Sequence, residues 1–294
     1  MELLPILPGI FLLPGANGGS FPFSNSVLVD SDTVCLIDAG CGLAQLEAGL
    51  EIATPDLILI THAHPDHISG CWMFDDVPLH VPAMSRADVG DLDRMARRFA
   101  PSHLQQPYKS YIQGSMGFEA CSPTHTYEAG ASFDFGQARL VAIHAPGHTE
   151  DHMCFFDTTS GLLISGDIDL TLFGPWYGDM ESDIEELKKS VQSVMDLEPR
   201  VVVSGHGGVF RTDLQGRFQR YLDVISMRHG AIAELVRKER TLDELVSLSP
   251  IYRERPLAPE LTAWWERQMI RKHLELLILE GRVQHTGKGY ISRR

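Results

Sequence analysis

Short apolar runs alternate with helix-like segments along most of the chain, and turn residues separate them. The apolar runs predict buried β-strands at residues 26–38 (two strands joined by a turn), 56–60, 80–82, 138–144, 153–157, 161–165 and 200–204. Helices are predicted at residues 43–52, 181–197 and 213–239. Because strands and helices alternate, the pattern predicts an α/β fold.

Most of the predicted strands end in a short polar cluster. The clusters contain Asp38, His62, His144–His148, Asp167 and His206. In proteins built from sheets and helices, sites form where several loops converge at the ends of strands. The sequence therefore predicts one site that draws residues from several distant segments.

The densest cluster is THAHPDH, residues 61–67, directly after an apolar strand. His62 and His64 can converge on one point from a tight loop, while Asp66 and His67 can face a second point nearby. Pro65 stiffens the loop between the two pairs. Imidazole and carboxylate ligands suit zinc, iron or manganese, whereas calcium and magnesium prefer oxygen ligands. Taken alone, the cluster would also fit a polar surface turn.

Three later segments repeat the arrangement of a strand end, a small residue and a ligand type. APGHTEDH (145–152) contains His148, ISGDID (164–169) contains Asp167, and VVVSGHGG (201–208) contains His206. With the first cluster they give seven candidate ligands, five histidines and two aspartates. That number fills two adjacent metal positions and leaves room for a water molecule.

The set of motifs resembles the metallo-β-lactamase superfamily in order and residue type. THAHPDH, APGHT, SGD and SGHG follow LIDAG (36–40), and the resemblance spans about residues 9–210. It implies an αββα sandwich with the site at one edge of the sheets. PGHTEDHM and the stretch from Glu185 to Gly207 also resemble lactamase-beta-like hydrolases, one branch of which is an endoribonuclease. One departure follows His67, where the sequence reads ISGC and many relatives have two glycines. Cys71, at the end of this segment, is expected to be a small buried residue.

The resemblance also implies a role for each candidate ligand. A first metal ion would be held by His62, His64 and His148. A second would be held by Asp66, His67 and His206. Asp167 would bridge the two ions, and Asp38 would orient the ligand loop. Two divalent transition metal ions are therefore expected as cofactors, zinc first, with iron or manganese as alternatives. His144 and His152 match no ligand position and are expected to be structural or to lie at the rim of the site.

The chain is expected to contain two domains. Residues 1–240 would form the metallo-β-lactamase-fold catalytic domain, in which 85–120 is an insertion that could act as a lid. Residues 241–294 would form a winged-helix-like appendage of two helices and a short hairpin. Its first helix is predicted to begin at Thr241, with Glu244 completing a capping box. A plain helical cap is the alternative for this tail.

Charge and cysteine content limit the choice of partners and compartment. The formal net charge is −14, and it is uneven: residues 237–294 hold 12 Lys and Arg against 8 Asp and Glu, whereas residues 1–236 hold 13 against 31. The acidic body argues against general binding to nucleic acid, which relies on Lys and Arg. Five cysteines without CxxC spacing favour a reduced, cytoplasmic setting. We expect no membrane span and no signal peptide.

The expected function is metal-dependent hydrolysis. A hydroxide that bridges two metal ions would be the nucleophile, and Asp66 would orient it and accept its proton. The first hypothesis for the substrate is a small ester, thioester or lactone, and the alternative is a phosphodiester in RNA or DNA. A di-iron redox module is less favoured, because such relatives carry Glu at the position of His64 and an added flavin domain. The apolar helix around AWWERQMI (263–270) leaves a homodimer open.

Overall fold

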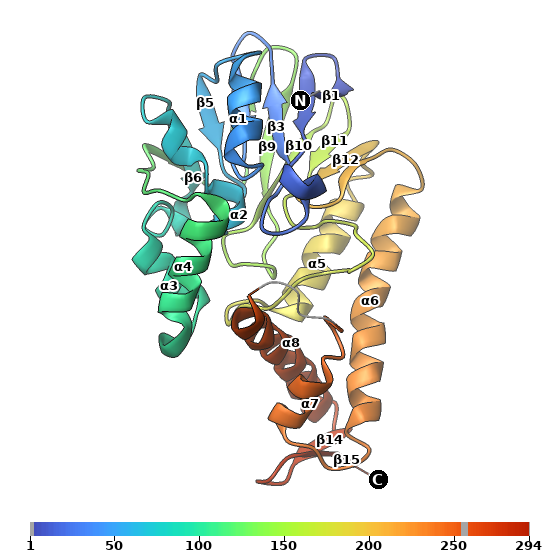
Figure 1. The fold of residues 1–294 in the computed structure, drawn as a ribbon. Helices are drawn as coiled ribbons and strands as arrows, with labels where there is room; N and C mark the ends of the chain where they lie inside the picture. The colour runs from blue at the N-terminus through green and yellow to red at the C-terminus, as the bar shows by residue number, and fades with distance from the viewer. Residues whose placement is uncertain (1–2, 254–257, 294) are drawn as a thin grey trace.

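Two β-sheets lie face to face in the upper part of the view in Figure 1, with helices on the outer side of each, and the C-terminal helices and hairpin extend below them. The computed structural model describes residues 3–253 and 258–293. The four layers are the αββα sandwich that the sequence predicted.

The first sheet has seven strands in sequence order. They are β1 (Leu4–Leu7), β2 (Ile10–Leu13), β3 (Ser26–Val29), β4 (Cys35–Ile37), β5 (Leu57–Leu59), β6 (Leu79–Pro82) and β7 (His125–Tyr127). The first four strands pair antiparallel and the last four pair parallel. All residues of β3 and β4 are buried, because this part of the sheet is covered on both faces.

The second sheet has six strands in the order β13-β12-β11-β10-β9-β8. They are β8 (Ser132–Asp134), β9 (Arg139–His144), β10 (Met153–Asp157), β11 (Leu162–Ile164), β12 (Val201–Ser204) and β13 (Gly208–Phe210). Only β11 and β12 pair parallel, and the long connection between them contains a helix.

The helices fall into two groups. Those from the first half of the chain are α1 (Leu43–Leu50), α2 (Pro65–Ile68), α3 (Leu92–Phe99) and α4 (Gln105–Met116), with 3-10 turns η1 (Ala16–Gly19), η2 (Cys71–Phe74), η3 (Ala83–Ser85) and η4 (Ser102–Leu104). Those from the second half are α5 (Ile184–Met195), α6 (Leu214–Leu235), α7 (Leu242–Leu248) and α8 (Pro259–Leu279). A hairpin of β14 (Val283–His285) and β15 (Tyr290–Ser292) follows.

Three apolar cores hold the layers together. The inner core lies between the sheets and includes Val27 from the first sheet and Phe155 from the second. One outer core packs α1–α4 on the first sheet, and the other packs α5–α8 on the second. Cys71 lies in the first outer core, buried as expected.

The helix α4 was not predicted. Its buried residues Tyr108, Ile112 and Met116 lie four positions apart, which is helical spacing. Pro107 and Gly114 interrupt the sequence and hide that period. The short strands β7, β8 and β13 were also missed, whereas the other predicted strands and helices are present within a few residues of their expected bounds.

The C-terminal tail forms two helices and a hairpin in the expected order. α7 begins after Thr241, whose side chain forms the predicted capping box with Glu244. α8 packs on its own chain: Trp265 joins the first outer core, and Met269 joins the second. The boundary at residue 240 and the winged-helix likeness stay predictions. None of the helices in the described ranges is long and apolar enough to cross a membrane.

Replacing Phe155 by alanine should lower the free energy of unfolding by about 3–5 kcal/mol, because the ring is fully buried between the sheets. Ile52→Ala is the control: Ile52 is 53% exposed, and its loss should change stability by roughly 0.5 kcal/mol. Denaturant unfolding of both variants measures the difference. Equal effects would contradict the assignment of the inner core.

Candidate metal centre

The THAHPDH segment turns sharply where β5 ends and α2 begins. His64 is the N-cap of α2 in extended conformation, and Pro65 occupies the first turn, where proline costs no hydrogen bond. Asp66 and His67 therefore stand on the first turn of the helix, whereas His62 and His64 precede it. All four side chains are buried.

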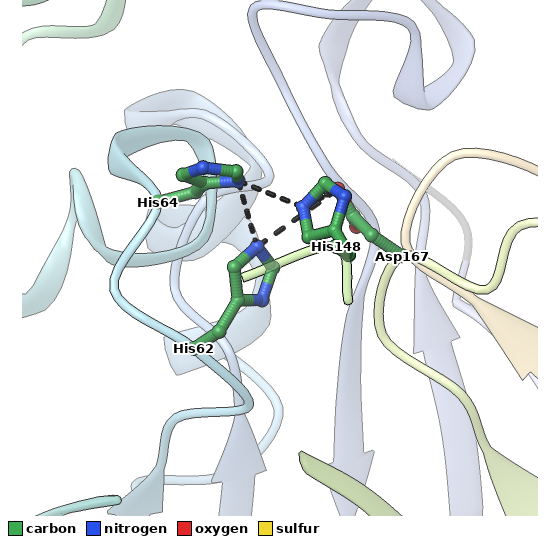
Figure 2. Close-up of side chains that lie close together, drawn as sticks. All are labelled: His62, His64, His148 and Asp167. Carbon is green, nitrogen blue, oxygen red and sulfur yellow. Dashed lines mark hydrogen bonds and ion pairs between the residues drawn. The ribbon is translucent and has the colours of Figure 1, made fainter. Parts of the chain in front are cut away.

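Three imidazoles converge on one point (Figure 2). The Nδ1 atom of His64 lies 3.0 Å from Nε2 of His62 and 2.9 Å from Nε2 of His148. Nitrogen ligands of a tetrahedral zinc ion, each at ~2.0–2.1 Å, would lie about 3.3 Å apart. The three nitrogens are thus already close to the spacing that a metal ion requires.

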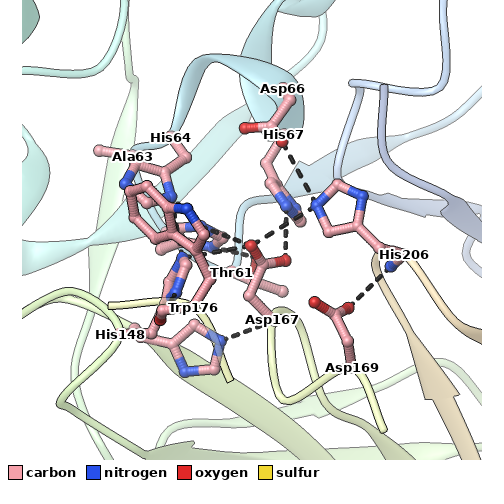
Figure 3. Close-up of polar contacts among 12 residues, drawn as sticks. Thr61, Ala63, His64, Asp66, His67, His148, Asp167, Asp169, Trp176 and His206 are labelled. Carbon is pink, nitrogen blue, oxygen red and sulfur yellow. Dashed lines mark hydrogen bonds and ion pairs between the residues drawn. The ribbon is translucent and has the colours of Figure 1, made fainter. Parts of the chain in front are cut away.

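A second group lies beside the first (Figure 3). Asp66, His67 and His206 bring their ligand atoms within 4.8 Å of one another, and Oδ2 of Asp66 is 3.3 Å from Nε2 of His206. Asp167 stands between the groups. Its Oδ1 is 2.8 Å from Nε2 of His67, and its Oδ2 is 3.2 Å from Nε2 of His148. The fold therefore brings all seven predicted ligands together, with the carboxylate of Asp167 in the middle.

The second ring nitrogen of each of the five histidines has its own partner. The pairs are His62 Nδ1 with Thr61 Oγ1, His64 Nε2 with Asp179 Oδ2, His67 Nδ1 with Asp38 Oδ2, His148 Nδ1 with the Trp176 carbonyl and His206 Nδ1 with the Gly19 carbonyl. Such contacts fix the tautomer and the orientation of a histidine ligand. Each ring consequently directs its other nitrogen toward the centre.

Asp38 connects the two groups from behind. Its carboxylate accepts hydrogen bonds from the backbone and the hydroxyl of Thr61, both at 2.8 Å, and lies 2.8 Å from His67. The residue adopts a positive φ of 59°, which is uncommon outside glycine. Its buried position supports the predicted role in orienting the ligand loop.

Two observations test whether this centre fits a metal ion. The Nε2 atom of His67 and Oδ1 of Asp167 are buried and form no well-oriented hydrogen bond, and their one close partner is each other, at 2.8 Å. A Cβ atom added to Gly205 would lie 2.8 Å from both Asp167 and His67, so only glycine leaves this space open. The residues present therefore fit a metal ion.

The electrostatics of the centre depend on Asp167. Burial would raise the pKa of Asp167, but His67, His206 and His148 hold that pKa well below normal. Burial would likewise lower the pKa values of His67 and His206, but the nearby carboxylates, Asp167 first, raise both well above normal.

Asp169 was not singled out from the sequence. It groups with Asp167 and His206 as a further candidate ligand, and it accepts a hydrogen bond from the backbone of His206 at 2.8 Å. Burial and the charge of Asp167 raise its pKa to about 7. The signal was present in ISGDID, where the two aspartates repeat the i, i+2 spacing of His62 and His64.

Asp151 was not singled out from the sequence either. Asp151 accepts a hydrogen bond from the backbone of Ala63, between two candidate ligands, and binds Arg98 at 2.7 Å. Arg98 also binds Asp88 and Glu181, so this side chain of α3 is paired rather than free for a substrate.

His152 and His144 behave as expected. His152 is buried, and its Nε2 accepts a hydrogen bond from the backbone of Asp167 at 3.0 Å, so it is structural. His144 is exposed and contacts the carbonyl of Glu150.

A pocket of about 540 Å³ lies over both groups of candidate ligands. Its walls are largely apolar, and the side chains that form them include Phe21, Phe99, Tyr108, Ile112, Trp176 and Trp265. They come from the N-terminal loop, from 85–120, from the loop after Asp167 and from α8. Within the described ranges, no Lys or Arg lines the pocket.

The sequence also resembles known families. The family model of the metallo-beta-lactamase superfamily matches residues 19–206. An atrochrysone carboxyl ACP thioesterase of Passalora fulva is 30% identical over 219 residues, 69% of this chain. An acyl-coenzyme A thioesterase of Homo sapiens is 28% identical over 153 residues, 47% of this chain. Each alignment covers only 55% of the relative's own length.

Solved structures share the fold. A metallo-beta-lactamase family protein of Thermus thermophilus superposes with a TM-score of 0.75 at 23% identity, covering 98% of this chain and all of that one. A beta-lactamase domain protein of Burkholderia ambifaria gives 0.72 at 18% identity, covering 99% of this chain and 94% of the other. Both likenesses extend through the C-terminal tail.

Metal uptake by this centre should release protons. The pKa values of His67, His148 and His206 are raised in the metal-free chain, and a histidine must be neutral to bind a metal. The apparent zinc affinity should therefore rise as the pH rises through these pKa values, and binding at about pH 7 should release protons. Zinc titration calorimetry in buffers of different ionisation enthalpy measures this release. Heats that do not depend on the buffer would contradict the prediction.

Proposed function

This chain belongs to the metallo-β-lactamase superfamily, and from that premise we propose that it is a binuclear metal-dependent hydrolase of thioesters with an apolar acyl group. The observation that carries the proposal is the position of two groups of candidate ligands at the base of an apolar pocket. The pocket can hold an apolar group of the substrate while the reacting carbonyl faces the ligands.

The proposed ligands are those that the motifs assign. His62, His64 and His148 would hold the ion at position 1, and Asp66, His67 and His206 the ion at position 2, with Asp167 between them. When bound, two divalent ions would activate a water molecule at neutral pH and polarise the substrate carbonyl. Zinc is the first candidate, with iron or manganese as alternatives.

The side chains of the protein would supply position and proton transfer. Asp66 faces both the pocket and His206, so it can orient the attacking water and accept its proton. Phe99, Tyr108 and Ile112 of segment 85–120 stand in the wall and would exclude water, which supports the proposed role of this segment as a lid.

Two lines of support favour a thioester. The two curated relatives described above are named thioesterases, and their names concern acyl groups on carrier protein and on coenzyme A. The absence of Lys and Arg from the described lining gives a nucleic-acid backbone no counter-charge beyond the metal ions, which disfavours the phosphodiesterase alternative. We also propose that the substrate is a small molecule and that the protein is cytoplasmic and forms a homodimer.

Metal content and hydrolysis test this proposal together. The purified chain should bind about two zinc equivalents and hydrolyse medium- and long-chain acyl thioesters. His62→Ala and Asp167→Ala should lower both metal content and turnover, whereas His144→Ala, a change at an exposed histidine outside the centre, should leave both unchanged. Metal binding with turnover of a bis-aryl phosphodiester but no thioester would contradict the substrate class.

Ile112→Ala should selectively weaken the use of long acyl groups. Ile112 stands in the pocket wall, and the lost apolar contact is worth about 1–2 kcal/mol, or roughly 5–30-fold in kcat/KM for a long-chain thioester. An acetyl thioester would not reach the wall, so its kcat/KM should stay unchanged. The ratio of the two values is the measurement. Equal losses for both substrates would show that Ile112 does not contact the acyl group.

A further inference from the structure

The two proposed metal positions are oriented by different parts of the chain. His67 and His206 of position 2 contact Asp38 and the Gly19 carbonyl, which belong to the N-terminal half. At position 1, only His62 is held from that half, through Thr61. His64 and His148 instead contact residues 173–182, which we call the strap.

The first contact of the strap is with His64. The carboxylate of Asp179 lies 2.7 Å from Nε2 of His64, and the side chain of Asp179 is almost fully buried. The backbone carbonyl of Asp179 accepts a hydrogen bond from the ammonium group of Lys272 at 2.5 Å. Lys272 stands on α8, so a short chain of contacts connects α8 to one candidate ligand.

The second contact of the strap is with His148. Its Nδ1 atom lies 3.1 Å from the carbonyl of Trp176, whose indole donates to the hydroxyl of Tyr252 at 2.5 Å. The backbone of Tyr252 donates to Glu266, a fully buried carboxylate on α8 that also accepts from Ile251. A separate chain of contacts therefore also begins on α8 and ends at a candidate ligand.

Lys272 is buried where α8 meets the strap, and its ammonium contacts the backbone of Asp179. The residue is only 8% exposed, and within the described ranges its ammonium forms no ion pair. Burial lowers the pKa of Lys272 to about 8, although the charge of Asp179 favours the ammonium form. Its hydrogen bond fixes the backbone of the one residue whose carboxylate holds His64.

We propose that α8 positions the ligands of metal position 1, with Lys272 as a positioning residue that acts on His64 through Asp179. The inference rests on the proposed metal centre and assigns a role to the C-terminal tail. Because position 2 is held from the N-terminal half, loss of Lys272 should weaken position 1 alone.

Zinc competition with a chelator tests the proposal on the full-length chain. Contacts that orient a histidine ligand are worth about 10–100-fold in metal affinity, so Lys272→Met should weaken one of two binding steps by that factor. His64→Ala and His206→Ala identify the steps, since each removes a proposed ligand of one position. The weakened step should be the one that His64→Ala removes.

Tyr177→Phe is the matched control. The Tyr177 hydroxyl also connects the strap to α8, at 2.8 Å from Nε2 of His273, but it contacts no candidate ligand. Both zinc steps should stay unchanged in this variant. If Lys272→Met does not fold, Asp179→Asn, which keeps the shape of the side chain, should show the same loss at position 1.

Three results would overturn the inference. Unchanged zinc affinity in Lys272→Met would show that α8 does not position the ligands. If Lys272→Met does not fold, unchanged zinc affinity in Asp179→Asn would show the same. Weakening of the step that His206→Ala removes would place the effect at the wrong position. A native chain that binds no zinc, iron or manganese would remove the proposed function itself, whereas two normal zinc steps in both Lys272→Met and Asp179→Asn would remove only the inference.

Discussion

The negative charge of Asp167, buried among imidazoles, is the constraint on which the rest of the site depends. A carboxylate in that position is stable only with positive charge close by, and a metal ion or protonated histidines can supply it. Each histidine that faces Asp167 is held at its second nitrogen by a carboxylate, a hydroxyl or a carbonyl. The fold provides these partners from η1 and from loops at the edge of the two sheets, so the geometry of the site depends on the sandwich.

Much of this centre could be predicted from the sequence because its candidate ligands lie in short motifs. THAHPDH sets four of them within six positions, and His148, Asp167 and His206 follow strands with strong apolar patterns. The inner strands were also predictable, since burial on both faces makes their sequences continuously apolar. The bridging position of Asp167 came from family resemblance rather than from spacing.

The residues that orient the ligands could not be found in this way. Asp179 lies 115 positions from His64, and nothing in the sequence around Asp179 distinguishes it from an aspartate in a surface loop. Lys272 stands on a helix whose period predicts only amphipathic packing. The α4 helix was missed for a local reason, because a proline and a glycine interrupt its apolar period. Long-range polar contacts of this kind become visible only when the fold is known.

The candidate ligands and the apolar walls of the pocket come from different parts of the chain. The candidate ligands follow the strands of the sandwich, whereas the apolar walls come from the N-terminal loop, segment 85–120, the strap and α8. Residues outside the superfamily motifs therefore form the apolar part of the pocket in which we propose that the substrate lies. If α8 also positions His64 and His148, the same helix shapes the pocket and supports the metal centre beneath it.

Anomalous X-ray diffraction from crystals of the zinc-loaded chain would test the central claim most directly. The account predicts two zinc peaks about 3.5–4 Å apart, one beside His62, His64 and His148 and the other beside Asp66, His67 and His206, with Asp167 between them. A single peak, or zinc bound only at surface carboxylates away from these residues, would contradict a binuclear centre and the hydrolase proposed from it.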